Sequence, residues 1–293
     1  MATSEERPDT AALDTRLQPL FDIVGDVAIA AERSAAQVAD SDSFHTAFDG
    51  RVLQRGIKGL KAARLLIGEG YWEHAAAVTR QLFELLVNME HLASFPDRGT
   101  AISKYNAFGL LQYFLSEVRR MDYEKERGRP EGTRWEASVR DTLDKHYDDF
   151  KLPPKADGTT RWRSSWSGKT TRDLAESSPD SMRIRQYVLL FTTWSEQAHA
   201  APGVFAADLF VQYEEEVIAE AFAEIKEELN VSLDLIAGVA KREAQTLYMA
   251  IIHFMQLWQQ LPKVSAPKRE VDLWLRNAGA FMAQRVSGPS LPI

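Results

Sequence analysis

The chain has 293 residues, 45% of them hydrophobic and 26% charged, which is typical of a globular protein with a sizeable core. Its 42 acidic residues outnumber its 35 lysines and arginines, and the net charge of −7 argues against a broad basic surface for nonspecific nucleic-acid binding. A small basic pocket is still compatible with this balance. The chain has no cysteine, which excludes disulfides, cysteine-ligated zinc, iron–sulfur clusters and thiol catalysis.

The first ten residues, "MATSEERPDT", are polar and acidic and lack the apolar core of a signal peptide. No uninterrupted apolar run approaches the length that a bilayer requires. We therefore expect a cytoplasmic protein with no membrane partner.

Helical periodicity dominates the chain, and the alternation typical of strands is nearly absent. We expect Pro19 to bend or split the first helix, and Ser41 or Ser43 to cap the second. The predicted fold class is all-α: a helical bundle with a long inserted loop and a C-terminal helical extension. Apolar spacing and stop signals predict helices over residues 10–39, 41–70, 71–94, 101–126, 135–150, 181–200, 204–229, 231–261 and 268–285.

The composition of the chain changes between residues 127 and 172, where glycine, proline and polar residues interrupt the helical pattern. Because Trp162 and Trp166 are costly to leave in water, we expect an ordered loop here. The C-terminal extension is expected to pack on the core or to form a dimer seam. The sequence thus predicts three segments: an N-terminal helix at 1–40, a core bundle at 41–203 that contains the loop, and an extension at 204–293.

Arg80 and Glu84 lie one turn apart on the predicted helix 71–94, on a stripe that continues through Val87 and His91. One interpretation is a solvated face with an intrahelical ion pair worth about 0.3–0.5 kcal/mol. The other is an inward-facing pair, in which Arg80 binds a phosphate or carboxylate and Glu84 orients the guanidinium. The helix by itself leaves both interpretations open.

The stretch "WSEQAHAAPG" closes the predicted helix 181–200 and places Ser195 and His199 one turn apart. The helix dipole alone favours a histidine in the last turn, but a general acid or base facing a pocket would use the same position. Ser195 would hydrogen-bond to His199 or to a ligand, and it lies outside any Gly-x-Ser-x-Gly elbow. Glu196 and His199 form one Glu-x-x-His; the second one that a di-iron site needs is missing, so no metal is expected.

The segment 161–172, "RWRSSWSGKTTR", contains basic residues and two tryptophans. Its "SGKT" is not a Walker loop, because Arg163 stands where that loop needs glycine and no strand precedes it. One interpretation is a lid whose tryptophans stack on a base, and the other is a loop whose tryptophans pack into the bundle. The possible anion donors are Arg161, Arg163, Lys169 and Arg172.

The long predicted helix 231–261 carries an apolar face, for which core packing and a dimer seam are the two interpretations. His253 is expected to belong to the same packing. The face is formed by Tyr248, Ile252, Met255 and Trp258.

Three stretches, "LLIGEGYWEHAAAVTRQLFELLVNMEHL", "WSGKTTRDLAE" and "YVLLFTTWSEQAHAAP", together resemble a bacterial all-helical family catalogued only as a domain of unknown function. The resemblance covers roughly residues 44–203. The family's motifs are Gly-Tyr, Arg-x-x-x-Glu, Trp-Ser-Gly and Ser-x-x-x-His, which stand here at Gly70 and Tyr71, Arg80 and Glu84, Trp166 to Gly168, and Ser195 and His199.

That family is similar to the nucleotide-binding helical (HEPN-type) domains, many of which are ribonucleases or inert relatives in toxin–antitoxin and phage-defence systems. The chain departs from the nuclease motif, since its one Arg-to-His spacing match, Arg140 and His146, lies outside the stretches that carry the resemblance. The resemblance selects Arg80, Glu84 and His199 together, and so favours the inward-facing interpretation of the Arg80–Glu84 pair.

The sequence and this resemblance lead us to expect a nucleic-acid-handling protein, in its most specific form a metal-independent ribonuclease of a defence or toxin–antitoxin system. The alternatives are a non-catalytic interaction or regulatory module and a nucleotide sensor. The expected partners are RNA or a nucleotide, a protein partner and a second copy of the chain, with no cofactor. The candidate catalytic residues are Arg80, Glu84 and His199, and the candidate binding residues are Trp166, Ser167, Lys169, Arg172 and Ser195.

Overall fold

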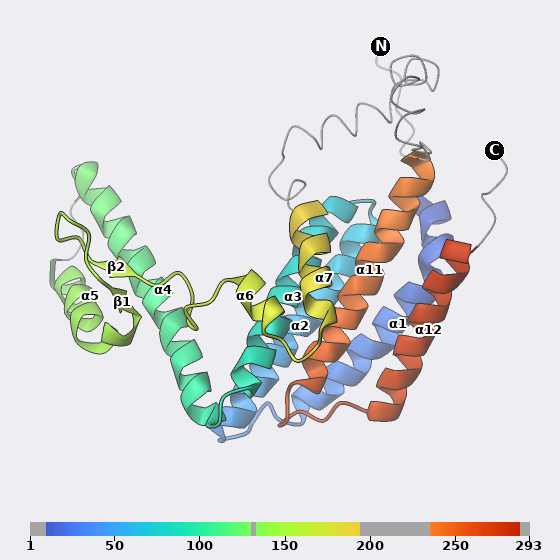
Figure 1. Cartoon of the computed structure of the whole chain (residues 1–293), viewed down its shortest axis with the longest axis horizontal. Coiled ribbons are helices and arrows are strands. Elements are labelled where there is room, and N and C mark those ends of the chain that lie inside the picture. Colours follow the sequence, from blue (N-terminus) through green and yellow to red (C-terminus); the bar gives the residue numbers. More distant parts are fainter. Residues whose placement is uncertain (1–9, 130–132, 194–234, 288–293) are drawn as a thin grey trace, which may run out of the picture. The chain divides into compact units, whose positions relative to one another are not determined.

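The computed structural model describes residues 10–129, 133–193 and 235–287, and its fold is all-α as the sequence predicts (Figure 1). A 3₁₀ turn at Asp148–Phe150 and a π-helical turn at Leu189–Thr193 accompany the helices. In chain order the elements are α1 (Thr10–Ala36), α2 (Phe44–Gly68), α3 (Trp72–Ala93), α4 (Arg98–Glu126), α5 (Thr133–His146), β1 (Lys151–Leu152), β2 (Arg161–Trp162), α6 (Thr171–Glu176), α7 (Met182–Val188), α11 (Leu235–Gln259) and α12 (Lys268–Ser287).

The helix ends follow the local signals in the sequence. Ser43 caps α2, where its side chain accepts a hydrogen bond from the Thr46 backbone N–H. Pro19 lies inside α1 without ending it, because the buried stripe of this helix, with Leu17 and Leu20 among its members, holds both sides of the proline in one helix. The predicted helix 204–229 lies outside the described residues.

The segment predicted as an ordered loop, residues 127–172, contains α5 and a short antiparallel ribbon. In the ribbon Lys151 pairs with Trp162, and Leu152 pairs with Arg161. The backbone N–H of Arg163 then donates to the carbonyl of Phe150, which continues the ribbon by one further bond. The tryptophan-bearing strand is thereby fastened to the turn that follows α5.

The chain divides into two compact units. Unit 1 comprises residues 1–90 and 178–293, and unit 2 comprises residues 91–177. The boundary predicted at residue 40 falls inside unit 1, where α1 packs along α2, and the boundary predicted at residue 203 lies outside the described residues. Unit 2 is therefore an insertion into unit 1 at the level of the sequence.

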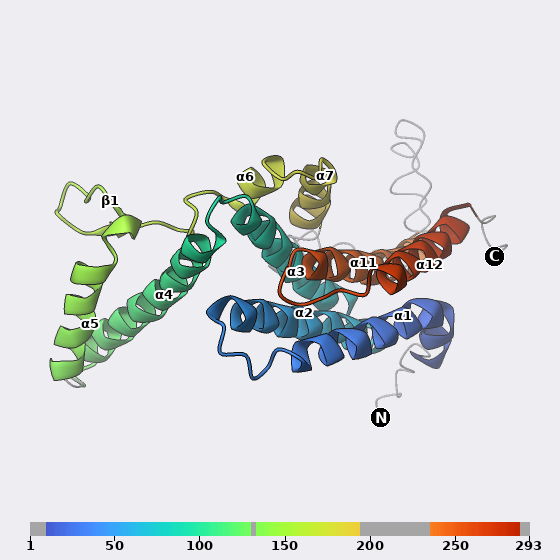
Figure 2. The same cartoon turned by 90° about the horizontal axis from the view of Figure 1, so that it is seen from below.

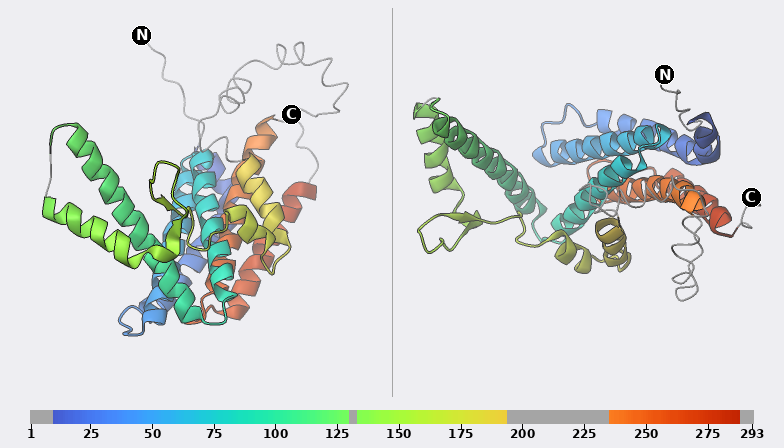
Figure 3. Two further views of the ribbon diagram at one scale, coloured as in Figure 1. Left: turned by 60° about the vertical axis from the view of Figure 1, so that its left-hand side comes forward. Right: turned by 90° about the horizontal axis from the view of Figure 1, so that it is seen from above.

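Four helices of unit 1, α1, α2, α11 and α12, pack against one another as a bundle. Figure 2 and Figure 3 show α1 and α2 on one side of this bundle and α11 and α12 on the other. Two glycines on α2 allow close packing. A Cβ at Gly56 would lie 3.0 Å from side-chain atoms of Phe254 and Leu257 on α11, and one at Gly59 would lie 2.9 Å from Leu82 on α3.

Unit 2 has a smaller core, formed mainly where α5 packs along α4. Half-buried aromatic rings, including Phe108, Phe114 and Trp162, extend this core. Its buried members are Leu111, Met121, Val139, Leu143, Tyr147 and Phe150. Within the described ranges of both units, no helix combines the length and hydropathy needed to cross a membrane.

Candidate functional site

Two deeply buried charges of unit 1 form an ion pair: Glu90, near the end of α3, and Arg183 on α7, each with a side chain only 3% exposed. The Arg183 guanidinium donates to Glu90 Oε1 from Nη2 at 2.6 Å and from Nε at 2.9 Å. Ser178 Oγ donates to Glu90 Oε2 at 2.9 Å. Because the chain leaves unit 1 after Glu90 and returns at Ser178, this carboxylate also links the two ends of the inserted segment.

Arg183 Nη1 completes the network. It donates to the side-chain oxygens of Gln186 and Gln256, both at 2.9 Å, and lies 3.1 Å from Asp180. A buried ion pair is stable only when its remaining donors and acceptors are satisfied in this way. The network joins α3, α7 and α11, and we interpret it as structural.

His253 on α11 is fully buried beside the Phe83 ring, with 5.3 Å between the ring centroids. Burial lowers its pKa to about 3, the Arg183 charge acts in the same direction, and the Thr79 backbone acts in the opposite one. His253 is therefore neutral in the folded protein near pH 7. Its place in the packing is the one that the sequence predicts.

Arg80 and Glu84 form the predicted pair on α3, with 3.2 Å between Nε and Oε1. Their side chains are 25% and 39% exposed, so the pair is neither a solvated face nor a buried site. The Arg80 guanidinium carbon lies 3.8 Å from the centroid of the Phe191 ring, which itself stacks on Tyr187 at 4.5 Å. Phe191 belongs to the π-helical turn after α7, a kind of distortion that is frequent at functional sites.

The structure separates the predicted site residues into three groups. Arg80 and Glu84 belong to unit 1. Ser195 and His199 lie outside the described residues, so the predicted pocket around His199 stays a prediction. The remaining four, Trp166, Ser167, Lys169 and Arg172, fall together in unit 2 on the turn before α6 and on α6 itself.

Trp166 is 4% exposed, and its ring packs inside unit 2 against three aromatic side chains. The ring centroids lie 5.4 Å away for His91, 5.8 Å for Phe95 and 5.5 Å for Tyr105. The sequence leaves two interpretations of segment 161–172 open, a lid that stacks on a base and a loop that packs into the protein. For Trp166 the burial fits the packed loop. Its faces are covered by protein, which leaves none of them for stacking on a base.

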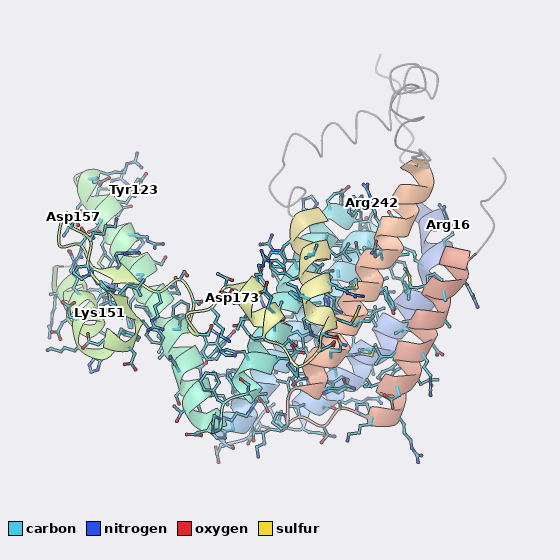
Figure 4. The ribbon with its side chains drawn as sticks, in the orientation of Figure 1. Arg16, Tyr123, Lys151, Asp157, Asp173 and Arg242 are labelled. Carbon is cyan, nitrogen blue, oxygen red and sulfur yellow. The ribbon has the colours of Figure 1, made fainter. Side chains whose placement is uncertain are left out.

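Side-chain and backbone hydrogen bonds fix the turn that follows Trp166. Gly168 has φ +77°, a left-handed conformation that favours glycine. The Lys169 backbone N–H donates to Ser167 Oγ at 3.1 Å, and the Lys169 carbonyl accepts from Ser165 Oγ at 2.8 Å. Thr170 then caps α6 in a capping box with Asp173, which is labelled in Figure 4.

Positive charge gathers beside this turn. The pKa of His91 is lowered by burial and then by the charges of Lys169 and Lys104. Lys169 Nζ donates to Ser177 Oγ at 3.3 Å, while the exposed Arg172 pairs with Glu176 at 2.8 Å. In the described part of the chain, no group of three or more histidine, aspartate or glutamate side chains is arranged to hold a metal ion.

The exposure and ion pairs of side chains bear on two further predictions, the apolar face of α11 and the Arg140–His146 spacing. On the apolar face of α11, Met255 and Trp258 are fully buried in the core of unit 1, whereas Tyr248 and Ile252 are half-buried, and the dimer seam stays a prediction. Arg140 pairs with Glu136 at 2.9 Å and with Asp122 at 2.7 Å, while His146 is exposed at the end of α5. Arg140 and His146 therefore lie on an ordinary charged helix and do not form a nuclease site.

Sequence reasoning missed Glu90, Arg183 and the role of His91. Glu90 and Arg183 are 93 positions apart, and no motif links them. His91 lies on the same helical stripe as Arg80 and Glu84, so helical periodicity alone could have identified it as a candidate residue. Its environment of Lys104 and Lys169, however, depends on folding of the segment that follows.

Comparison with known proteins gives one finding. The model of a family described as a family of unknown function, DUF5677, matches residues 50–217. No curated protein and no solved structure matches the chain. The predicted resemblance to a family of unknown function is confirmed by this match, whereas the motifs assigned to that family and the likeness to HEPN-type domains stay predictions.

Proposed function

The chain belongs to the family of unknown function DUF5677, and we propose that it is an RNA-handling helical protein whose phosphate contacts are made by residues 161–172. The observation that carries the proposal is the charge of this segment, which has four cationic side chains and no carboxylate. Arg161 and Arg172 are exposed, and Arg163 and Lys169 are half-buried. Cations displayed in this way bind a phosphate backbone by releasing its counterions.

The distribution of charge over the two units supports the proposal. Unit 2 contains 16 lysines and arginines against 14 acidic residues, whereas the rest of the chain contains 19 against 28. The acidic unit 1 would repel a polyanion, so RNA binding is expected to concentrate on unit 2. This separation reconciles a net charge of −7 with a nucleic-acid partner.

Fluorescence anisotropy with a labelled single-stranded RNA tests the proposal across a range of salt concentrations. About three to four phosphate contacts predict a slope of roughly −2 to −3 for the logarithm of affinity against the logarithm of salt. The double variant Arg161→Gln/Arg172→Gln should weaken binding about tenfold at low salt and make that slope shallower by about 1.4.

The matched control is Arg119→Gln/Lys145→Gln, which removes two exposed cations from α4 and α5 of the same unit. It should change affinity less than twofold. Equal losses in both double variants, or no RNA binding by the unaltered protein at low salt, would contradict the proposal.

The more specific form of the proposal is metal-independent RNA cleavage. His199 would take the proton of a ribose 2′-hydroxyl as its oxygen bonds to the adjacent phosphorus, and the bond to the 5′-oxygen of the next nucleotide would break, with water protonating that oxygen. Arg80 would stabilise the negative charge that develops on the non-bridging phosphoryl oxygens. The support from the geometry is that Glu84 and the Phe191 ring hold the Arg80 guanidinium in place. Cleavage of labelled RNA in the presence of chelator, lost in both Arg80→Ala and His199→Ala at an unchanged melting temperature, is the expected result. Binding without cleavage would leave a non-catalytic RNA-binding protein.

A protein-interaction module is the second candidate, and the exposed apolar side chains of α4 favour it. Leu110 and Tyr113 are 55% and 53% exposed, one helical turn apart, and Tyr123 further along is 52% exposed. Light scattering of the purified protein measures whether it is a homodimer. Replacing Leu110 and Tyr113 by serine should shift any dimer towards monomer while leaving RNA affinity within twofold.

A nucleotide sensor would instead show a rise in melting temperature when nucleotides are added one at a time.

A further inference from the structure

We infer that Lys104, Arg163 and Lys169 form a phosphate-binding site beside the His91 ring on unit 2. The site would take one phosphate group, either from an RNA backbone or from a free nucleotide. It deepens the proposed function and rests on it, because it names the position at which the phosphate is held. Three features of unit 2 carry the inference: charge, missing ion partners and a prearranged turn.

The first feature is the one-sided charge around His91. Lys169 and Lys104 come from different parts of unit 2, the turn before α6 and the helix α4, and both act on the His91 ring. No carboxylate has a comparable effect on this ring within the described residues. The two lysine charges add to one another beside this ring and disfavour protonation of His91, and a bound anion would offset both charges.

The second feature is the lack of ion partners for these cations. Lys104, Arg163 and Lys169 have no carboxylate within 4.0 Å among the described side chains, and all three are half-buried. The Arg163 Nε atom is buried and has no hydrogen-bond acceptor in the described part of the chain. Such an unsatisfied donor calls for a ligand or water. In the same unit, carboxylates pair with Arg120, Lys125, Arg140, Lys145, Lys151 and Arg172.

The third feature is a turn that holds two of the cations before any ligand arrives. A Cβ atom at Gly168 would lie 3.0 Å from Arg163 Nη1, so the guanidinium rests against the backbone of the turn. Lys169 is held at its N–H by Ser167 and at its carbonyl by Ser165. A site that is ordered in advance loses less conformational entropy on binding. This arrangement explains why serine, glycine and lysine follow the buried Trp166.

The chemistry of these groups favours phosphate. A guanidinium donates in a planar fork and a lysine supplies a point charge, a combination suited to the several oxygens of a phosphate group. Since the Trp166 ring is buried, its faces are not open to a base. We therefore expect it to bind inorganic phosphate, a nucleotide and RNA through the same group, with little preference among bases.

The test uses the full chain with ¹³C-labelled histidine, and follows the NMR titration of His91 with and without inorganic phosphate. The spectrum of His91→Gln assigns the signal. A bound anion offsets the two lysine charges, so about 10 mM phosphate should raise the pKa of His91 if the Kd is about 1 mM. The exposed His146 of the same unit is the internal control and should not move.

The double variant Lys104→Gln/Lys169→Gln should raise the pKa of His91 without any ligand and abolish the further rise on adding phosphate. Lys145→Gln, which removes a cation already paired with Asp141, should change neither quantity. A His91 signal that ignores phosphate, or a phosphate response that survives in the double variant, would overturn the site.

Adenosine monophosphate and a short single-stranded RNA replace inorganic phosphate in two further titrations. A response to all three ligands identifies the phosphate group as the common element, and a response that appears at a lower concentration of RNA than of the other two ligands assigns the site to the nucleic-acid backbone. If phosphate moves His91 while anisotropy detects no RNA binding, the site stands and the proposed function fails. If RNA binds through Arg161 and Arg172 without moving His91, the function stands and the site fails.

Discussion

Two arginine–glutamate pairs involve helix α3, one within the helix and one that joins it to α7, and they differ in exposure and in sequence separation. Arg80 and Glu84 lie one turn apart on the same helix, with side chains 25% and 39% exposed. Glu90 and Arg183 are 93 positions apart, and each is 3% exposed. The pair that is obvious in the sequence is thus the weaker one, and the pair that organises the core has no sequence signature.

The difference follows from solvent. Water screens the half-exposed pair, so its contribution is small whichever side of the helix it occupies. Both members of the buried pair have lost their hydration. Gln186 and Gln256 accept hydrogen bonds from Arg183, and Ser178 donates one to Glu90, in place of the bonds to water. Burial therefore decides how much an arginine–glutamate pair contributes to the stability of the fold. Three predictions test the effect of burial on charged and titratable side chains, from the largest expected effect to the smallest.

The largest effect is expected from Glu90→Ala, which leaves the Arg183 guanidinium buried without its carboxylate. Breaking a buried pair by removing one partner costs about 3–5 kcal/mol in the free energy of unfolding. Urea unfolding followed by circular dichroism measures it. A loss below about 1 kcal/mol would mean that the pair is not buried in solution.

A double variant, Glu90→Leu/Arg183→Met, separates loss of the pair from loss of volume. Apolar replacement of both charges is often neutral, so the double variant should regain most of the stability that Glu90→Ala loses. If it is as unstable as the single variant, the carboxylate acts mainly through Ser178 and the closure of the insertion.

An intermediate effect is expected from the pH dependence of His253. An unfolded histidine titrates near 6.5, whereas burial lowers the pKa of folded His253 to about 3. The unfolded chain thus binds a proton in this window that the folded chain excludes, and stability falls as the pH decreases from about 6.5 towards 3. The contribution between about pH 8 and about pH 5 is about 2 kcal/mol.

The variant His253→Phe removes this part of the pH dependence while filling much of the same volume beside Phe83. Unfolding curves at the two pH values should therefore differ by about 2 kcal/mol less in this variant than in the unaltered protein. An unaltered pH dependence in His253→Phe would show that His253 becomes protonated inside the fold.

The smallest effect is expected from the Arg80–Glu84 pair. A double-mutant cycle with Arg80→Met and Glu84→Gln should give a coupling energy of about 0.5 kcal/mol, as for other exposed pairs one turn apart. A coupling above about 2 kcal/mol would place this pair with Glu90 and Arg183, and would strengthen the catalytic reading of Arg80.

The sequence by itself determined the fold class and most of the helices. Helix periodicity and caps act locally, so the ends of α2 and α3 could be predicted to within a few residues, as could the start of α12. The sequence also predicted an ordered loop over residues 127–172, and the turn at Gly168 and Lys169 is ordered by local hydrogen bonds, because turn chemistry depends on neighbours in the chain.

Only the tertiary structure decided which charges are buried and which cations share a neighbourhood. It joined Glu90 to Arg183, and it brought the charges of Lys104 and Lys169 close enough to His91 to lower its pKa. It also buried Met255 and Trp258 of α11 and packed three aromatic rings around Trp166. These outcomes depend on contacts between residues far apart in the chain, where desolvation rather than local propensity sets the energy.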